Sequence, residues 1–331
     1  MSTTGDEHPV CHPDFTHRSR TDKARADIAT EPPRNVGHRG RELPRVAWAI
    51  ITTVLALLLA PALSAAAARP DVQSVSALVV DDLGNRLYGK NTTRPRPIAS
   101  ITKLMTAMVV LDAGLPLDDV IQITEQDLDR LRHSRSRLRI GEAMLSRQDM
   151  LTVALMSSDN RAAAALGRTT FAGGTPEFVD AMNRKAAELG MWSSRFADAS
   201  GLDAHNQSTA DDLARLVEAA ARYPLIRAIT STGETTMHPF AERGPLPYRN
   251  TNPLVRDANW QVEVSKTGYI NEAGRCLVMQ AVIGGHRLRI VLLGAAGKYT
   301  PFADAKRLRS WLETGPLNPE SVAASGWSSW E

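Results

Sequence analysis

The stretch PIASITKLMTAMVVL, residues 97–111, decides how the rest of the chain is interpreted. It is a proline-marked loop that leads into an apolar helix, with Ser100 at the helix start and Lys103 three positions further on. Side chains three apart lie on the same face of a helix, so the lysine amine can reach the serine hydroxyl. The spacing therefore predicts a nucleophile beside its base. Serine and lysine are common residues, however, and Ser100 by itself could equally be a helix N-cap.

The residues that follow favour the chemical interpretation. Positions 104–111 are apolar on nearly every side of the helix, which is typical of a helix in the middle of a domain. A lysine at the start of such a helix is partly removed from water, and this disfavours its charged form. We therefore expect a lowered pKa for Lys103, so that its amine can accept a proton.

Composition sets the broad class of the protein. The chain has 331 residues and 43% hydrophobic content, enough for one large domain or two modest ones. The formal net charge is +3 and the basic residues are scattered, which argues against a nucleic-acid partner. The two cysteines, Cys11 and Cys276, lie in segments of opposite character, so no disulfide is expected. Cys276 lies in a strand-like run and is predicted to be an inert core thiol.

Residues 1–45 are rich in charge, proline, histidine and threonine and lack any apolar periodicity. This composition predicts a disordered N-terminal tail. Near its start the tail has one cysteine and three histidines, residue types that bind metals, but their spacing matches no zinc motif, so a solvated tail is the better interpretation. These residues are His8, Cys11, His12 and His17.

Residues 46–68 have the three parts of an export signal: a basic flank before them, an uncharged apolar core, and small residues at the exit. The length leaves two alternatives open, a cleaved signal peptide or an uncleaved anchor in the inner membrane. In either case we expect the rest of the chain in the periplasm or cell envelope. Membrane contact is expected only through residues 46–63, if the segment is uncleaved.

The remaining pattern predicts an α+β domain. Residues 74–80 and 86–89 read as a strand pair, several helices follow, and residues 261–267, 276–283 and 287–293 read as closing strands. Strands at both ends of the domain can share one antiparallel sheet, with helices packed on it and an all-helical lobe beside it. The helices are expected at 146–156, 161–166, 176–190, 208–223 and 303–312.

Two further motifs accompany Ser100 and Lys103. Ser158-Asp159-Asn160 lies on a short loop between two expected helices, and Lys266-Thr267-Gly268 is expected at the end of a strand, just before a turn. With the first motif they make, in order, the set that is typical of penicillin-binding proteins and serine β-lactamases. Over residues 72–313 the chain resembles the low-molecular-mass penicillin-binding proteins of the D-alanyl-D-alanine carboxypeptidase and endopeptidase family, and its D,D-endopeptidase branch most. Residues 314–331 are expected to be a C-terminal tail.

This resemblance implies a β-lactamase/transpeptidase-like fold and a peptidoglycan hydrolase that works through a serine acyl-enzyme. Its substrate would be the D-alanyl peptide cross-links of the wall, and β-lactam antibiotics would be covalent inhibitors. No metal or other cofactor is implied. The catalytic residues would be Ser100 as nucleophile, Lys103 as base, Ser158 as proton relay and Asn160 as substrate holder. The substrate-binding residues would be Lys266, Thr267, Gly268 and Tyr269, with the backbone amides of Ser100 and Tyr269 as the oxyanion hole.

Three alternatives stay open at this point. A β-lactamase needs a dedicated deacylation base, and the sequence offers no suitable Glu-x-x-x-Asn loop, since Glu188 is expected within a helix. A non-catalytic wall-binding protein would not need all three motifs intact. A D-alanyl-D-alanine carboxypeptidase would use the same chemistry, and we favour the endopeptidase because few residues follow the closing helix.

Overall fold

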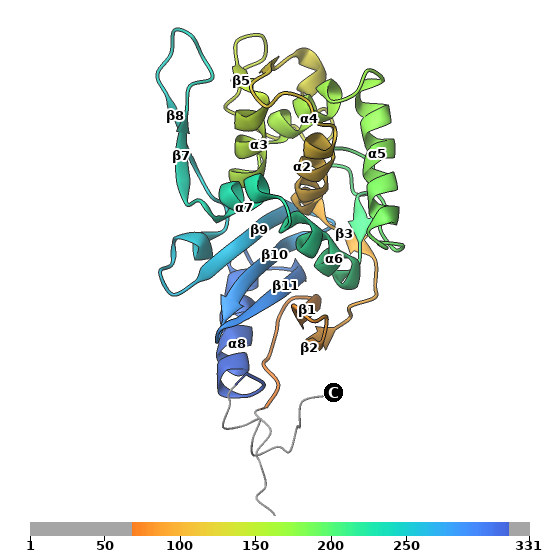
Figure 1. Ribbon diagram of the computed structural model, residues 1–331, viewed down its shortest axis with the longest axis vertical. Helices are drawn as coiled ribbons and strands as arrows, with labels where there is room; N and C mark the ends of the chain where they lie inside the picture. Colours follow the sequence, from red (N-terminus) through yellow and green to blue (C-terminus); the bar gives the residue numbers. More distant parts are fainter. Residues whose placement is uncertain (1–67, 318–331) are drawn as a thin grey trace, which may run out of the picture. The chain divides into compact units, whose positions relative to one another are not determined.

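A computed structural model of the protein describes residues 68–317 (Figure 1). The predictions for the N-terminal tail, the leader segment and Cys11 lie outside these residues, and the domain boundaries at 72 and 313 stay predictions. Among the residues that are described, no helix has the length and hydrophobicity needed to cross a bilayer.

The core of the fold is an antiparallel sheet of five strands in the order β2-β1-β11-β10-β9. The first strand, β1, pairs with the last, β11, so that Ser76 lies opposite Leu293. This confirms the prediction of an α+β domain whose terminal strands share a sheet. The strands are β1 (Ser76–Asp81), β2 (Arg86–Lys90), β9 (Gln261–Ile270), β10 (Gly274–Ile283) and β11 (His286–Ala295).

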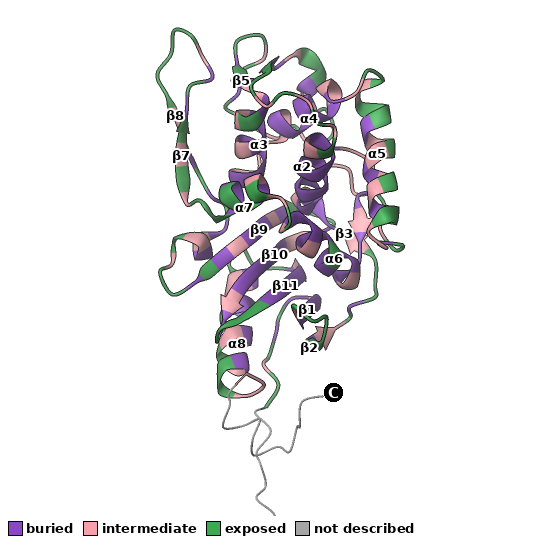
Figure 2. Cartoon of the chain, viewed as in Figure 1, coloured by how far each residue is buried: buried purple, intermediate pink, exposed green. Residues whose placement is uncertain are grey.

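Helices cover both faces of this sheet (Figures 1 and 2). On one face, Leu308 and Leu312 of α8 are fully buried with Leu277 and Ile290 of the sheet. On the other face a larger apolar cluster joins the sheet to α2, α6 and the helical lobe. The helices are α2 (Thr102–Asp112), α3 (Arg147–Met156), α4 (Asn160–Thr169), α5 (Gly174–Glu188), α6 (Ala210–Ala220), α7 (Pro224–Ser231) and α8 (Thr300–Thr314).

Helix α2 is buried on all sides, as its sequence predicts. Every residue from Thr102 to Val110 is buried. A short 3₁₀ turn, η1 (Ala99–Ile101), precedes the helix and carries Ser100. The N-cap position of α2 is Ile101 and has no side-chain capping bond, so Ser100 is not the helix cap. The hydroxyl of Ser100 is thus left for another role.

Some element boundaries differ from the predictions. Strand β9 continues to Ile270, so the Lys266-Thr267-Gly268 motif lies inside the strand and not at its end. Gly268, expected at the strand end, instead lies inside the strand, where it allows a close approach of two backbones, described below. Helix α4 likewise continues past Gly167 to Thr169, and α6 ends at Ala220, three residues before the expected Tyr223.

Several short elements were not predicted, because their sequences are too short or too polar to show a period. Among them, α7 and the hairpin of β7 and β8 lie between α6 and β9. The short strands are β3 (Arg96–Pro97), β4 (Val120–Gln122), β5 (Met144–Ser146), β6 (Gln207–Ser208), β7 (Glu234–Met237) and β8 (Leu246–Arg249), and the further 3₁₀ turns are η2 (Glu125–Asp127) and η3 (Pro253–Arg256).

Cys276 behaves as the sequence predicts. Its side chain lies in the sheet core with 2% exposure, and burial raises the pKa of its thiol to about 11. A thiol with so high a pKa carries almost no thiolate at neutral pH, so it is chemically inert.

The carboxylate of Asp304, on α8, binds the segment that leads into β1. Asp304, fully buried, accepts hydrogen bonds from the backbone and hydroxyl of Ser74 at 2.7 and 2.6 Å and from the backbone of Gln73 at 3.0 Å. Arg307 donates to it at 2.9 Å. The bonds from Gln73 and Ser74 join segments more than 200 positions apart in the chain.

Replacing this carboxylate should destabilise the fold. Asp304→Ala leaves buried donors without an acceptor, so we expect the free energy of unfolding to fall by about 3 kcal/mol. Urea unfolding followed by circular dichroism measures this. Asp118→Ala, at an exposed position, is the control and should change stability little. A loss below about 1 kcal/mol for Asp304→Ala would show that the carboxylate does not fasten the two segments.

Candidate active site

Ser100 and Lys103 are in direct contact. The Lys103 Nζ lies 2.8 Å from the Ser100 Oγ, as the spacing of the two residues predicts. The same amine donates to the Asn160 Oδ1 at 2.7 Å and to the backbone carbonyl of Ser200 at 2.6 Å. Asn160 is the first residue of α4, and Ser200 lies on the loop between α5 and β6. Three segments far apart in sequence therefore meet at one amine.

A second lysine contacts the second serine. The Nζ of Lys266, on β9, donates to the Ser158 Oγ at 2.9 Å and to the Thr267 carbonyl at 3.0 Å. Ser158 has a φ of +63°, a left-handed conformation that costs a non-glycine residue of order 1 kcal/mol. The adjacent Asp159 caps α4 by accepting from the Ala162 amide at 3.1 Å, and this fixes the strained loop.

Both lysines are almost completely buried, each with 1% exposure. Burial lowers the pKa of Lys103 to about 8, against the opposing effect of the negative charges on Asp198 and Asp159. Burial lowers the pKa of Lys266 well below its usual value, and the positive charge of Lys103 lowers it further. A change of this size for Lys103 disfavours its charged form by roughly 3 kcal/mol. Its amine can therefore accept a proton near neutral pH.

The strand that carries Lys266 is at the edge of the sheet. Strand β9 pairs with β10 on one side and is the last in the strand order. Beside it, the Thr267 hydroxyl donates to the Thr251 Oγ1 at 2.6 Å. Tyr269 is 47% exposed, and the guanidinium of Arg275 lies 3.6 Å from the centre of its ring. An edge strand with polar side chains can accept an extended peptide as an additional strand.

Two glycines allow the polypeptide to close around Ser100. A Cβ on Gly268 of β9 would lie 2.8 Å from the Ile98 carbonyl oxygen and 3.2 Å from the Ser100 nitrogen. A Cβ on Gly201 would lie 2.0 Å from the Ala99 carbonyl oxygen, and Gly201 also has a φ of +81°. Sequence reasoning gave Gly268 a substrate-binding role, and the structure gives it a packing role as well. Gly201 was noted only as part of the family resemblance.

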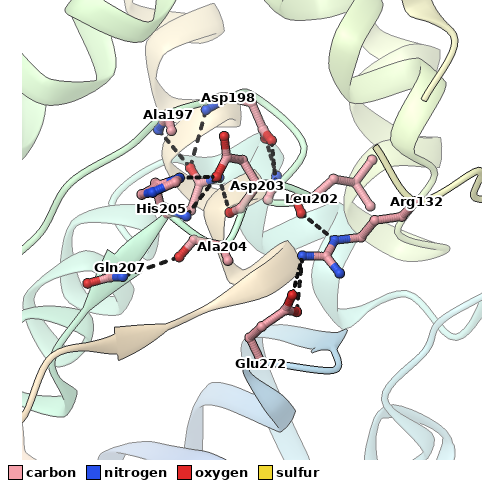
Figure 3. A network of polar contacts seen from close by, with 11 residues as sticks. Arg132, Ala197, Asp198, Leu202, Asp203, Ala204, His205, Gln207 and Glu272 are labelled. Atoms are coloured by element: carbon pink, nitrogen blue, oxygen red, sulfur yellow. Dashed lines mark hydrogen bonds and ion pairs between the residues drawn. The ribbon is translucent and has the colours of Figure 1, made fainter. Parts of the chain in front are cut away.

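Further residues that line the site were missed from the sequence. The Asn160 Nδ2 donates to the Ser134 Oγ at 2.9 Å. Arg132 donates from its Nε to the Leu202 carbonyl at 2.6 Å and pairs with Glu272 at 3.0 Å, so it joins three loops (Figure 3). Arg132 lies in a run of several arginines, and no spacing in that run distinguishes it from its neighbours.

The chemistry of the site is that of amines and hydroxyls. Within residues 68–317, no carboxylate is hydrogen-bonded to Ser100 or Lys103, and no group of His, Cys, Asp and Glu is arranged to hold a metal ion. Glu188 is the last residue of α5 and pairs with Lys185 at 3.6 Å. A serine beside a buried amine is an arrangement for nucleophilic attack by the serine.

Comparison with known proteins agrees with this geometry. The family model described as D-alanyl-D-alanine carboxypeptidase matches residues 63–297, well over half of the chain. The chain belongs to this family. All three motifs of the site lie inside the matched range, so the family match and the geometry concern the same residues.

Two relatives within the family are similar over nearly their whole length. A D-alanyl-D-alanine endopeptidase of Pseudomonas aeruginosa is 46% identical, over 84% of this chain and 92% of that protein. One of Escherichia coli is 45% identical, over 85% of this chain and 92% of that protein. The carboxypeptidases among the similar proteins are 28 to 31% identical. The DD-transpeptidase of Streptomyces K15 has the same fold, with a TM-score of 0.68, 26% identity, and coverage of 73% of this chain and 98% of that one.

The close contact at Gly201 can be tested by adding one methyl group. Gly201→Ala would push the Ala99 carbonyl away and displace Ser100, so we expect acylation by a fluorescent penicillin to slow by about 100-fold or more. The matched control is Gly141→Ala, because Gly141 also has a positive φ, +76°, but no atom within 4 Å of the added Cβ. Equal rates for the two variants would contradict the packing role of Gly201.

Proposed function

We propose that the protein is a peptidoglycan D,D-endopeptidase, which hydrolyses D-alanyl cross-links through an acyl-enzyme on Ser100. The observation that carries this proposal is the contact between the Ser100 hydroxyl and the buried amine of Lys103, at 2.8 Å. The lowered pKa of Lys103 gives the amine the basicity that this role needs near neutral pH.

In the first half of the reaction, the Ser100 Oγ attacks the carbonyl carbon of the D-alanyl residue while its proton passes to the Lys103 Nζ. The negative charge that develops on the carbonyl oxygen is stabilised by the backbone amides of Ser100 and Tyr269. The C–N bond then breaks, and the leaving amine takes a proton from the Ser158 hydroxyl. Ser158 in turn takes up the proton that Lys103 received from Ser100, so that Lys103 is neutral again for the second half. Lys266 donates to the Ser158 hydroxyl at 2.9 Å and holds it in place for this relay.

In the second half, a water molecule attacks the ester and gives its proton to the amine of Lys103. The C–O bond breaks, Ser100 regains its hydroxyl, and the product leaves with a new carboxylate. A β-lactam follows the same first half and remains as an ester on Ser100. No carboxylate in the described part of the chain is bonded to Ser100 or Lys103, which favours slow release of that ester and inhibition.

The substrate peptide would lie along the free edge of β9, as an added antiparallel strand. Asn160 would hold its backbone from the opposite side of the site, and Thr267 would donate to its carbonyl or carboxylate. The same site could release a terminal D-alanine, so D-alanyl-D-alanine carboxypeptidase is the second candidate. The higher identity to the endopeptidases, 45 to 46%, supports the first.

The substrate also bears on the location of the protein. A peptidase that acts on the wall must work outside the cytoplasm, and we propose that residues 46–68 direct its export to the periplasm. This segment is the part of the sequence with a basic flank, an apolar core and a small-residue exit.

The pH dependence of acylation follows from the pKa of Lys103. Because the neutral amine is the base, the acylation rate with a fluorescent penicillin should fall about tenfold per pH unit below 8 and level off above it. Lys103→Ala should remove acylation at every pH. Lys185→Ala, which removes an amine paired with Asp112 at the surface, should keep the native profile. A rate independent of pH between 6 and 9 would contradict the assigned base.

The reaction itself is tested on purified muropeptides. The protein should open cross-linked dimers to monomers, and Ser100→Ala should abolish this, with liquid chromatography of the products as the readout. Ser157→Ala is the matched control, because among the described residues the Ser157 hydroxyl bonds only to the Val153 carbonyl of the preceding helix, at 2.8 Å. Release of terminal D-alanine from monomers without opening of dimers would favour the carboxypeptidase.

A further inference from the structure

The loop that supplies the Ser200 carbonyl is folded around the carboxylate of Asp198. One oxygen of this carboxylate accepts from the Ser200 amide at 2.7 Å, from its hydroxyl at 3.1 Å, and from the Gly201 amide. The other oxygen accepts from the Asp203 amide at 2.8 Å. Donors from three of the five residues after Asp198 thus converge on one side chain, which fixes the turn.

The same loop is held from outside at both ends. Asn206 accepts from the Ala197 amide at 3.0 Å, and Arg132 donates to the Leu202 carbonyl at 2.6 Å (Figure 3). Between these anchors, the Ser200 carbonyl is directed at the Lys103 Nζ, 2.6 Å away. The position of this carbonyl is therefore set by the loop and not by the lysine.

Proton counting shows what this carbonyl does for the base. A neutral amine has two N–H donors and one lone pair. The Ser200 carbonyl and the Asn160 Oδ1 can only accept, so both N–H groups of neutral Lys103 go to them. The lone pair is then directed at its third neighbour, the Ser100 hydroxyl. If either acceptor moved, an N–H group could turn toward Ser100 and the lone pair away from it.

We propose that Asp198 is a positioning residue for the general base: it holds the Ser200 carbonyl that orients the Lys103 lone pair toward Ser100. This inference rests on the proposed roles of Ser100 and Lys103. Within residues 68–317, Asp198 makes no hydrogen bond to the Lys103 amine or the Ser100 hydroxyl, so it acts through the loop and through the field of its charge.

The charged groups around Lys103 determine in which direction the charge of Asp198 shifts the pKa of that amine. Asp198, from the loop, and Asp159, from the start of α4, both raise the pKa of Lys103, while burial lowers it. From β9, Lys266 interacts with Lys103 as a like charge when both are protonated. Removing the charge of Asp198 takes away one of the two carboxylates that favour the protonated form. The pKa of Lys103 should then fall further.

The test is the pH profile of acylation by a fluorescent penicillin for Asp198→Asn. We expect the maximal rate to fall about tenfold and the acidic limb to move about half to one pH unit lower. Asp198→Thr, a second neutral variant that keeps one acceptor oxygen, should shift the limb in the same direction. Asp203→Asn is the matched control, because this neighbouring carboxylate bonds to His205 and should leave rate and limb unchanged.

A purely structural role predicts a different result. Thermal unfolding identifies any variant that does not fold, and the folded neutral variant is then compared with the native protein. If the acidic limb of the variant's pH profile lies at the same pH as that of the native protein, the proposal is overturned, whether or not the maximal acylation rate falls. If the native protein forms no acyl-enzyme at all, the proposed function fails instead, so the two failures are distinguishable.

Discussion

Two lysine amines that are buried without a hydrogen-bonded carboxylate are the constraint on which the site depends. Lys103 and Lys266 each have 1% exposure, and within residues 68–317 their hydrogen-bond partners are hydroxyl, amide and carbonyl oxygens. An amine in such surroundings is stabilised in its neutral form, because acceptors without charge do not compensate the loss of water. Burial therefore provides a base near neutral pH from lysine, a side chain that is normally protonated at that pH.

Enclosing these amines requires several backbones to meet closely. Gly201 and Gly268 leave no room for a side chain where their segments contact the turn that carries Ser100. Ala99 and Ser158 both have left-handed φ values, +49° and +63°, although neither is a glycine. Strain of this kind persists only where the surrounding structure holds it, and here it occurs next to one serine of the site, Ser100, and at the other, Ser158. The rigid helix α2 and strand β9 on either side provide that support.

The sequence predicted the fold class and the first of the two lysine–serine pairs, Ser100 with Lys103, well, because three short motifs and the apolar helix after Ser100 carry them. It did not predict how the pairs are held. Asp198 and Ser200 act through a carbonyl oxygen and a folded loop, and backbone geometry leaves little trace in residue types. Gly268 shows a different difficulty: the sequence placed it at the end of a strand and gave it a substrate-binding role, and its close packing inside the strand was not predicted.

The central claim is that burial lowers the pKa of Lys103 far enough for its neutral amine to act as a base near neutral pH, and the proton affinity of that amine can be measured directly. NMR of isotope-labelled lysine side chains, with Lys103 assigned by substitution, follows each amine through a pH titration. The account predicts a midpoint of about 8 for Lys103, while exposed lysines titrate near their usual value of about 10.4. A Lys103 midpoint as high as that of the exposed lysines would contradict it.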